Sequence, residues 1–267
     1  MKLLKRRPKD ELRQFIKNYW ILDISGDEEF KQRIIPFGSV DLIIHLKSPM
    51  DKWDSEHHII EPLIFLEGQY LHAKHVQSSS ATMILGVSFY PWATRAFFNH
   101  YADEFSNRVI SYDLVDPKNL ETLYWSLDPS DTYDSLFMKI EEFFLAKKRK
   151  QLNSAEQGIK NFLNRHPELT WDRWSTLYKT WGTSMRSQEK AFKRLIGIDS
   201  KKLYSKIKFQ NAFQLLESAK HKKLTDIALE AGYYDQSDFC RHFKRFVGVS
   251  PKKYLKEGTS CFGQLIT

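Results

Sequence analysis

The residues best suited to a chemical task are polar and basic side chains on one face of a predicted helix near the C-terminus. Phe239, Phe243 and Phe246 recur at the i, i+4, i+7 spacing of a buried helical stripe. The opposite face can present hydrogen-bonding groups to base edges in the major groove of DNA. Its candidate base-reading residues are Gln236, Ser237 and Arg241. Lys244 and Arg245 follow on the same face and are candidates for binding phosphates, which fix position without reading sequence.

The stretch that precedes this helix is typical of a helix-turn-helix. Thr225 is placed to cap a short helix with Ile227 and Ala228 on its inner side. Gly232 marks the sharp turn at the end of that helix, and Asp235 is placed to cap the next one. A short helix, a tight turn and a basic second helix together predict a module whose second helix enters the major groove.

An internal repeat supplies a second copy of this module. Residues 190–198 align with residues 241–249 at an offset of 51, which is 241 − 190. Ser184 is placed to cap the first recognition helix. The candidate base-reading residues of this copy are Arg186, Glu189 and Lys190, and its candidate phosphate-binding residue is Lys193. Two such helices about 34 Å apart can enter successive major grooves, so one chain can read two half-sites.

The helix expected before the first recognition helix, at residues 170–181, has bulkier side chains than its counterpart. Tyr178 stands where the second copy has Ala228, and Trp181 lies one turn further on. Bulk at this helix crossing predicts that the first module docks less regularly, or that the N-terminal domain sets its angle.

The second copy also carries an ordered set of small, aromatic, acidic and basic residues. The set is Ile227, Ala228, Gly232, Tyr233, Asp235, Ser237, Phe239, Arg241, Phe243, Lys244, Gly248, Pro251 and Tyr254. It resembles the signature of the AraC/XylS family of bacterial transcription regulators. Two N-terminal phrases, IIPFGSVDLIIHL at 34–46 and GVSFYPWATRAFF at 86–98, look like the sensory domain of one branch of that family. The resemblance implies a cupin-like barrel that binds a small molecule or mediates dimerisation, followed by a double helix-turn-helix domain.

The net charge of +8 is distributed unevenly along the chain. Residues 1–150 hold 20 Lys and Arg against 22 Asp and Glu, a net of −2. Residues 151–267 hold 21 against 11, a net of +10, and the two halves sum to +8. Such asymmetry is typical of a nucleic-acid-binding domain joined to a domain with another task. We therefore expect a sensory or dimerisation domain at 1–150, a DNA-binding domain at 151–258 and a tail at 259–267.

The predicted fold class is α+β. Short β-branched runs punctuated by Gly and Pro favour an N-terminal β-barrel or sandwich, cupin-like by the family resemblance, with flanking helices. The C-terminal domain is predicted to be all-α, with a long helix joining its two modules. Candidate strands lie at 32–47, 63–66 and 82–90, and candidate helices at 92–101, 120–126, 133–148, about 154–166 with Ser154 as cap, and 201–217; residues 11–20 suggest a short helix or lead-in.

Other reactive side chains form no pattern that predicts catalysis. No Ser/His/Asp, Cys/His or phosphate-cradling glycine pattern appears, so we expect neither an enzyme nor a cofactor. Asp41 and Glu67 could be site carboxylates or turn and sheet-end residues. Cys240 and Cys261 cannot form a disulfide framework, and Cys240 is either an inert thiol or a redox sensor. No metal is expected, because metal-ligand spacing is absent around the N-terminal histidines, which are His45, His57, His58, His72 and His75.

Composition favours a cytoplasmic protein with nucleic acid as its partner. Mean hydropathy is −0.50, and no stretch approaches the ~18 apolar residues of a membrane span. The expected partner is double-stranded DNA, without a membrane; RNA polymerase, a small-molecule effector and a second copy of the chain are further candidates. One alternative is a cupin-like small-molecule-binding protein or enzyme with a basic accessory domain. Another is an architectural DNA binder without sequence preference.

Overall fold

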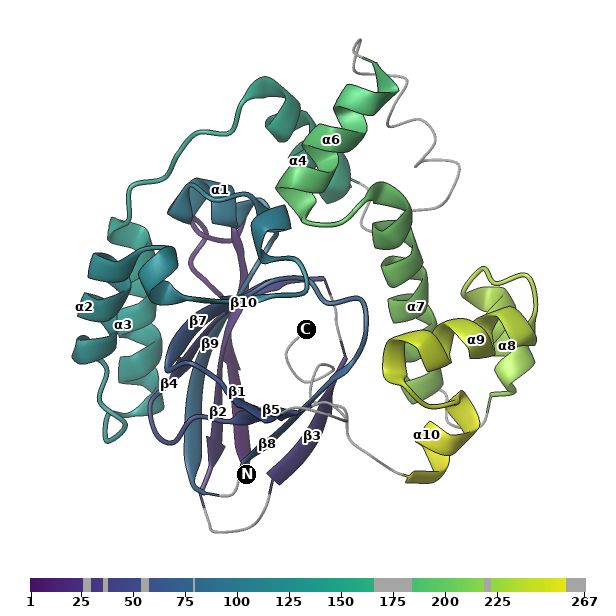
Figure 1. The fold of residues 1–267 in the computed structure, drawn as a ribbon, viewed down its shortest axis with the longest axis horizontal. Helices are drawn as coiled ribbons and strands as arrows, with labels where there is room; N and C mark the ends of the chain where they lie inside the picture. Colours follow the sequence, from purple (N-terminus) through teal and green to yellow (C-terminus); the bar gives the residue numbers. More distant parts are fainter. Residues whose placement is uncertain are drawn as a thin grey trace.

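The computed structural model describes residues 1–25, 30–35, 38–53, 58–78, 80–165, 184–218 and 222–257 (Figure 1). The helix expected at 170–181, with Tyr178 and Trp181, lies outside the described residues, as do His57, Cys261 and the tail at 259–267. No helix in the described ranges combines the length and apolar character needed to cross a membrane.

The N-terminal half contains two antiparallel sheets. The six-stranded sheet has the order β1-β2-β9-β4-β7-β10, and the four-stranded sheet has the order β3-β8-β5-β6. The strand bounds are β1 Lys2–Arg6, β2 Ile16–Ile24, β3 Phe30–Ile34, β4 Val40–His45, β5 Asp51–Trp53, β6 His58–Ile60, β7 Ile64–Glu67, β8 Lys74–Ser78, β9 Thr82–Phe89 and β10 Val109–Ser111. The α+β prediction is confirmed, and the described strands form two open sheets instead of one closed barrel.

The central strands of the six-stranded sheet are buried on both faces. All eight residues of β9 are buried, as a strand covered on both sides requires. Trp20 on β2 is the register partner of Gly86 on β9, and its indole lies across the glycine. A Cβ at position 86 would lie 2.0 Å from an indole carbon, so glycine is needed there for close packing. Residues 16–20 are therefore strand, and the expected helix over 11–20 is wrong for its second half.

Three helices and two short 3-10 turns accompany the six-stranded sheet (Figure 1). Their bounds are α1 Ala93–Phe98, η1 Ala102–Phe105, η2 Tyr112–Leu114, α2 Pro117–Ser126 and α3 Tyr133–Ala146. In α3 the stripe Leu136, Ile140 and Phe144 is fully buried in the same core as β2, β4 and β9. The stripe thus fixes α3 against the six-stranded sheet.

The C-terminal half is helical throughout its described residues. The helices are α4 Ser154–Arg165, α6 Met185–Ile196, α7 Ser200–Ser218, α8 Leu224–Glu230, α9 Gln236–Val247 and α10 Pro251–Glu257. The long helix α7 connects α6 to the group formed by α8, α9 and α10 (Figure 1). Asn153, not Ser154, caps α4, because its side-chain oxygen accepts from the Glu156 amide at 2.9 Å.

The two C-terminal modules belong to different hydrophobic cores. Phe192, Leu195 and Ile196 of α6 are part of the large core that also contains the six-stranded sheet. The module of α8 and α9 has its own core, which includes one N-terminal side chain, Ile35. The first module is therefore continuous with the N-terminal half, and the boundary near residue 150 stays a prediction.

Candidate nucleic-acid interface and inter-sheet cavity

Helix α9 has the caps and the buried stripe that the sequence predicted. A carboxylate oxygen of Asp235 accepts from the Asp238 amide at 2.7 Å, and the helix ends at Gly248 with a φ of 87°. Phe239, Phe243 and Phe246 are all buried. The prediction of a cap by Thr225 on the preceding helix is wrong. Helix α8 begins after Lys223 and has no side-chain cap there.

The outward face of α9 is open and basic. Ser237, Arg241, Lys244 and Arg245 are exposed. The Arg241 side chain is 77% exposed, and its only ion pair among the described residues is the 3.8 Å approach to Asp238. Gln236 is half-buried, and its side-chain oxygen accepts from the Thr225 hydroxyl at 2.7 Å. To read adenine with both amide atoms, Gln236 would donate through its amide nitrogen and accept at the second lone pair of the oxygen that binds Thr225.

Helix α6 presents an equivalent face. The Ser184 hydroxyl accepts from the Ser187 amide at 3.3 Å, which confirms the predicted cap. The predicted contact residues Arg186, Glu189, Lys190 and Lys193 are all exposed. In the first turns, Gln188 of α6 is buried and Gln236 of α9 binds Thr225, whereas Arg186, Ser237 and Arg241 are exposed and accessible to a ligand.

One short loop joins the N-terminal half to both recognition helices. We call residues 68–73, between β7 and β8, the bridging loop. The Gln69 side-chain amide donates to the Ile196 carbonyl, at the end of α6, over 2.6 Å. At its other end, the Ala73 amide donates to the Phe246 carbonyl of α9 over 2.9 Å. His72 Nδ1 donates to the neighbouring Arg245 carbonyl over 3.0 Å. The loop thus supplies partners for carbonyls in the last turns of both helices, which lack partners within the helix.

A buried lysine on α7 completes this contact. Lys206 is 1% exposed, and its ammonium nitrogen donates to the Gln69 side-chain oxygen over 3.1 Å. Burial, together with the nearby charge of Lys17, lowers the pKa of Lys206 to about 7, while Asp41 opposes the change. Gln69 therefore connects the end of α6 with the middle of α7 through a single side chain.

The 3-10 turn η1 holds the end of α6 from the other side. The Ser106 hydroxyl donates to the Gly197 carbonyl. Gly197 has a φ of 93°, and a Cβ there would lie 2.9 Å from the Ala102 carbonyl oxygen. Only glycine combines this conformation with such a close approach. The Arg194 guanidinium lies 3.8 Å from the centre of the Tyr101 ring, which adds a cation–π contact.

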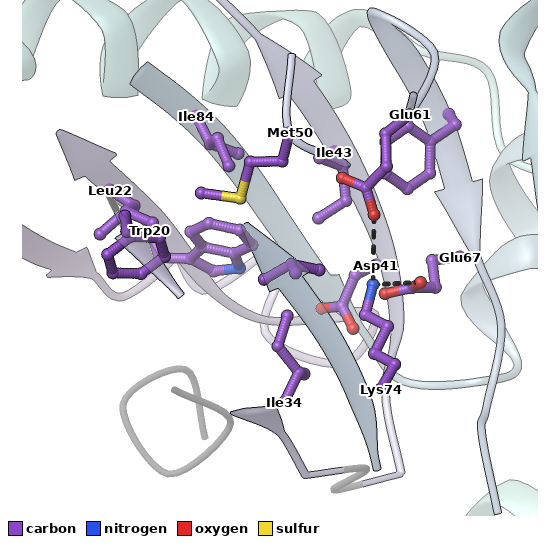
Figure 2. Close-up of a pocket in the computed structure, with 13 residues that line it drawn as sticks. Trp20, Leu22, Ile34, Asp41, Ile43, Met50, Glu61, Glu67, Lys74 and Ile84 are labelled. Carbon is purple, nitrogen blue, oxygen red and sulfur yellow. Dashed lines mark hydrogen bonds and ion pairs between the residues drawn. The ribbon is translucent and has the colours of Figure 1, made fainter. Parts of the chain in front are cut away.

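Behind the bridging loop, a cavity of about 60 Å³ lies between the two sheets (Figure 2). Figure 2 shows apolar side chains at one side and charged side chains at the other. The apolar side includes Trp20, Leu22, Met50 and Ile84. The charged side consists of Asp41, Glu61, Glu67 and Lys74. The cavity has space for about four water molecules.

The charged end is a buried network. Lys74 forms an ion pair with Glu67 and lies 3.6 Å from Glu61. Glu61 also contacts His45 Nε2 at 3.3 Å. Burial raises the pKa of Glu67, whereas Lys74 and His45 outweigh burial and lower the pKa of Glu61.

Asp41 lies beside this network. It faces Glu67 directly in the β4–β7 register. Its carboxylate accepts from the Ser39 hydroxyl over 2.7 Å and from the Ser88 hydroxyl over 2.5 Å. Burial raises the pKa of Asp41 despite these bonds and the nearby Lys17. Of the two sequence interpretations for Asp41 and Glu67, the structure thus favours cavity carboxylates that also stand at the ends of the β4–β7 register.

The remaining sequence candidates have structural environments without a catalytic pattern. No group of three or more His, Cys, Asp or Glu side chains within the described ranges is arranged to hold a metal ion. His45 is buried and contacts Glu61. His72 donates a hydrogen bond to the Arg245 carbonyl of α9. Cys240 is half-buried, and burial raises the pKa of its thiol, which disfavours the reactive thiolate.

In the comparison with known proteins, each half of the chain matches a different family model. A family model described as a helix-turn-helix domain matches residues 177–257, and one described as a domain of unknown function matches residues 4–111. An uncharacterized HTH-type transcriptional regulator of Haemophilus influenzae is 35% identical over 65 residues, which are 24% of this chain and 22% of that protein. The chain thus matches about a fifth of the length of this curated relative.

The solved structures that match the chain have low sequence identity to it. ToxT from Vibrio cholerae is 12% identical, with 96% of this chain and 98% of that chain covered and a TM-score of 0.47. ToxT bound to (E)-4-(8-methylnaphthalen-1-yl)but-3-enoic acid is 14% identical, with 88% and 97% covered and a TM-score of 0.45. The C-terminal domain of AraT, a response regulator from Geobacillus stearothermophilus, is 24% identical, with 42% and 91% covered and a TM-score of 0.33.

Proposed function

We propose that this chain is a sequence-specific DNA-binding transcription regulator controlled through its N-terminal half, because residues 177–257 match a helix-turn-helix family model and carry residues that resemble the AraC/XylS signature. The observation that carries the proposal is the pair of capped helices, α6 and α9, each with an exposed polar and basic face. The expected ligand of both faces is double-stranded DNA, read in two successive major grooves. We propose no catalytic activity.

The proposed base-reading residues are those on the first turns of the two helices. They are Arg186, Glu189 and Lys190 on α6, and Gln236, Ser237 and Arg241 on α9. Lys193, Lys244 and Arg245 are proposed to bind phosphates, since they lie further along the same faces. Arg245 also lines a groove with Lys201 and Lys202, where its charge adds to the attraction for a phosphate backbone.

The bridging loop offers a route by which the N-terminal half controls DNA binding. It contacts the last turns of both helices and leaves their first turns exposed. A change in loop position would therefore alter the relative placement of α6 and α9 without covering their DNA-binding faces. We propose that an effector shifts the population between two such placements. A second copy of the chain could act in the same way, and recruitment of RNA polymerase would follow DNA binding.

The first test is selection of bound fragments from a genomic DNA library at physiological salt, followed by sequencing. The proposal predicts a site with two short recognition blocks about one helical turn apart. Recovery of unrelated fragments would contradict it and would favour an electrostatic binder without sequence preference.

A pair of variants then separates base reading from phosphate binding on the selected site. Arg241→Ala should weaken specific binding by about 1 to 3 kcal/mol and relax discrimination at one base pair. Lys244→Ala should weaken binding to all sequences and reduce the slope of affinity against salt by about one. Fluorescence anisotropy on specific and scrambled duplexes measures both effects. Lys118→Ala, which removes an exposed charge from α2, is the matched control. Equal losses on both duplexes for Arg241→Ala would refute its role as a base reader.

A further inference from the structure

The inter-sheet cavity has more negative than positive groups in its wall. Three carboxylates, those of Asp41, Glu61 and Glu67, face one ammonium group, that of Lys74. Lys74 is already engaged by two of them. An anionic occupant would meet the carboxylates with no free cation among the lining residues. A cationic occupant would reduce the imbalance, because opposite charges attract strongly where water is excluded.

One oxygen in this wall lacks a hydrogen bond. Glu61 is 6% exposed, and its Oε1 accepts no hydrogen bond from any residue that the structure describes. The nearest cation is the Lys74 ammonium, which at 3.6 Å is beyond hydrogen-bond distance. A buried carboxylate oxygen without a donor costs free energy. It is therefore a binding point for an N–H donor that enters the cavity.

The opposite wall selects against a bare metal ion and for an organic body. Trp20, Leu22, Met50 and Ile84 line it, and none of these side chains offers a hard oxygen ligand. No cluster in the described part of the chain has the arrangement of a metal site. The cavity volume of about 60 Å³ limits the body to a few carbon atoms unless the sheets separate further.

We propose that the inter-sheet cavity binds a small primary amine, with its ammonium group held by Glu61 and Glu67 and its apolar body packed against Trp20. This inference rests on the proposed function, since it names the effector class of the regulator. The position of the cavity suits an effector site. Glu67 ends β7 and Lys74 begins β8, so the two cavity residues flank the bridging loop. An ammonium group that competes with Lys74 for Glu67 would act on both ends of the loop that contacts α6 and α9.

The test compares three probes with the same propyl body, which are propylamine, 1-propanol and butyrate. Binding to the full chain without DNA is measured by calorimetry at about pH 7.5, where an alkyl amine is protonated. Propylamine should bind about tenfold or more tighter than the alcohol, because hydrogen bonds to charged groups are the stronger ones. Butyrate should bind more weakly than the alcohol. Equal affinity for amine and alcohol, preference for butyrate, or no amine binding up to about 10 mM would each overturn the proposal.

Variants locate the bound amine. Glu61→Gln keeps the size of the side chain and should remove most of the preference for the amine over the alcohol. Glu67→Gln provides the same test if the first variant does not fold. Glu121→Gln, an exposed carboxylate on α2, should leave the preference unchanged. An unaltered preference in the folded Glu61→Gln and Glu67→Gln variants would overturn the assignment to this cavity.

A parallel measurement of DNA binding separates the two proposals. If the amine binds and no specific DNA site is found, the proposed function fails while the ligand assignment stands. If the chain selects a specific site and binds no amine, only the ligand assignment fails. If both bind, propylamine should change the affinity for the selected duplex in wild type and should not do so in Glu61→Gln.

Discussion

Replacement of Lys206 by Met is expected to raise the free energy of unfolding of the chain near neutral pH. The ammonium group is buried at 1% exposure, with Lys17 and Asp41 as its charged neighbours and Gln69 as its hydrogen-bond acceptor. Its folded-state pKa is about 7, against 10.5 for an unburied lysine. The unfolded chain therefore binds more protons than the folded chain between these two values, so the free energy of unfolding rises with pH across that window.

The size of the effect follows from the shift. The change in pKa from 10.5 to about 7 corresponds to about 5 kcal/mol of lost stability below pH 7. Between about pH 7 and 10 the loss should shrink by about 1.4 kcal/mol per pH unit. Methionine removes this cost but also removes the hydrogen bond to Gln69, which contributes about 1 kcal/mol. The net gain at about pH 8 should be about 2 kcal/mol.

Urea unfolding monitored by far-ultraviolet circular dichroism, repeated from about pH 7 to 10, measures the difference between the two proteins. Lys17 and Asp41 are electrostatically coupled to Lys206, so the difference reports the titration of Lys206 together with its interaction with these two groups. The stability advantage of Lys206→Met should shrink as the pH rises. Lys118→Met, at an exposed position on α2, is the control. Parallel stability curves for wild type and Lys206→Met would refute the low pKa and the burial argument behind it.

Three further changes test other parts of the structure. Gln69→Ala leaves the Ile196 carbonyl without its donor and should cost about 1 to 3 kcal/mol, seen as faster amide hydrogen exchange at the end of α6 and unchanged exchange in β4. Gly86→Ala places a methyl group against the Trp20 indole and should lower stability by about 1 to 3 kcal/mol with a shift in tryptophan fluorescence; an unchanged melting temperature would contradict the packing described. Asp235→Ala removes the cap of α9 and should cost about 0.5 to 2 kcal/mol in thermal unfolding, whereas a neutral result would mean that the cap carries no stability.

The two recognition helices were predictable because their signals are local. A cap such as Ser184 or Asp235 and a buried stripe such as that of Phe239 and Phe243 lie within a dozen residues of each other, and the duplication doubles the signal. The error at Thr225 also has a local cause. The Thr225 hydroxyl donates to the Gln236 side chain across the turn. Threonine is a residue type that often caps helices, but here its hydroxyl binds another side chain.

The cavity and the bridging loop were not predictable in the same way. Glu61, which precedes β7 of the six-stranded sheet, and Lys74, on β8 of the four-stranded sheet, meet in the cavity between the two sheets, and no short motif records that meeting. From the sequence alone, Gln69 lies in a polar loop and would be expected in a solvent-exposed turn. Lys206 suggests the exposed face of a helix, but α7 packs against the N-terminal half on that face and buries it. Only long-range packing distinguishes these residues from ordinary surface side chains.

The shared core of α6 and the N-terminal sheet sets an order for biosynthesis. Phe192, Leu195 and Ile196 complete a core whose other members come mainly from residues before 150, and these leave the ribosome first. The sheet can therefore serve as a template on which the first module closes, while the second module closes later on its own core and on Ile35. A fragment that starts near residue 151 would expose the apolar side of α6 to water. For studies of DNA binding by a shortened protein, the second module is accordingly the part to express alone, with Ile35 no longer covering its core.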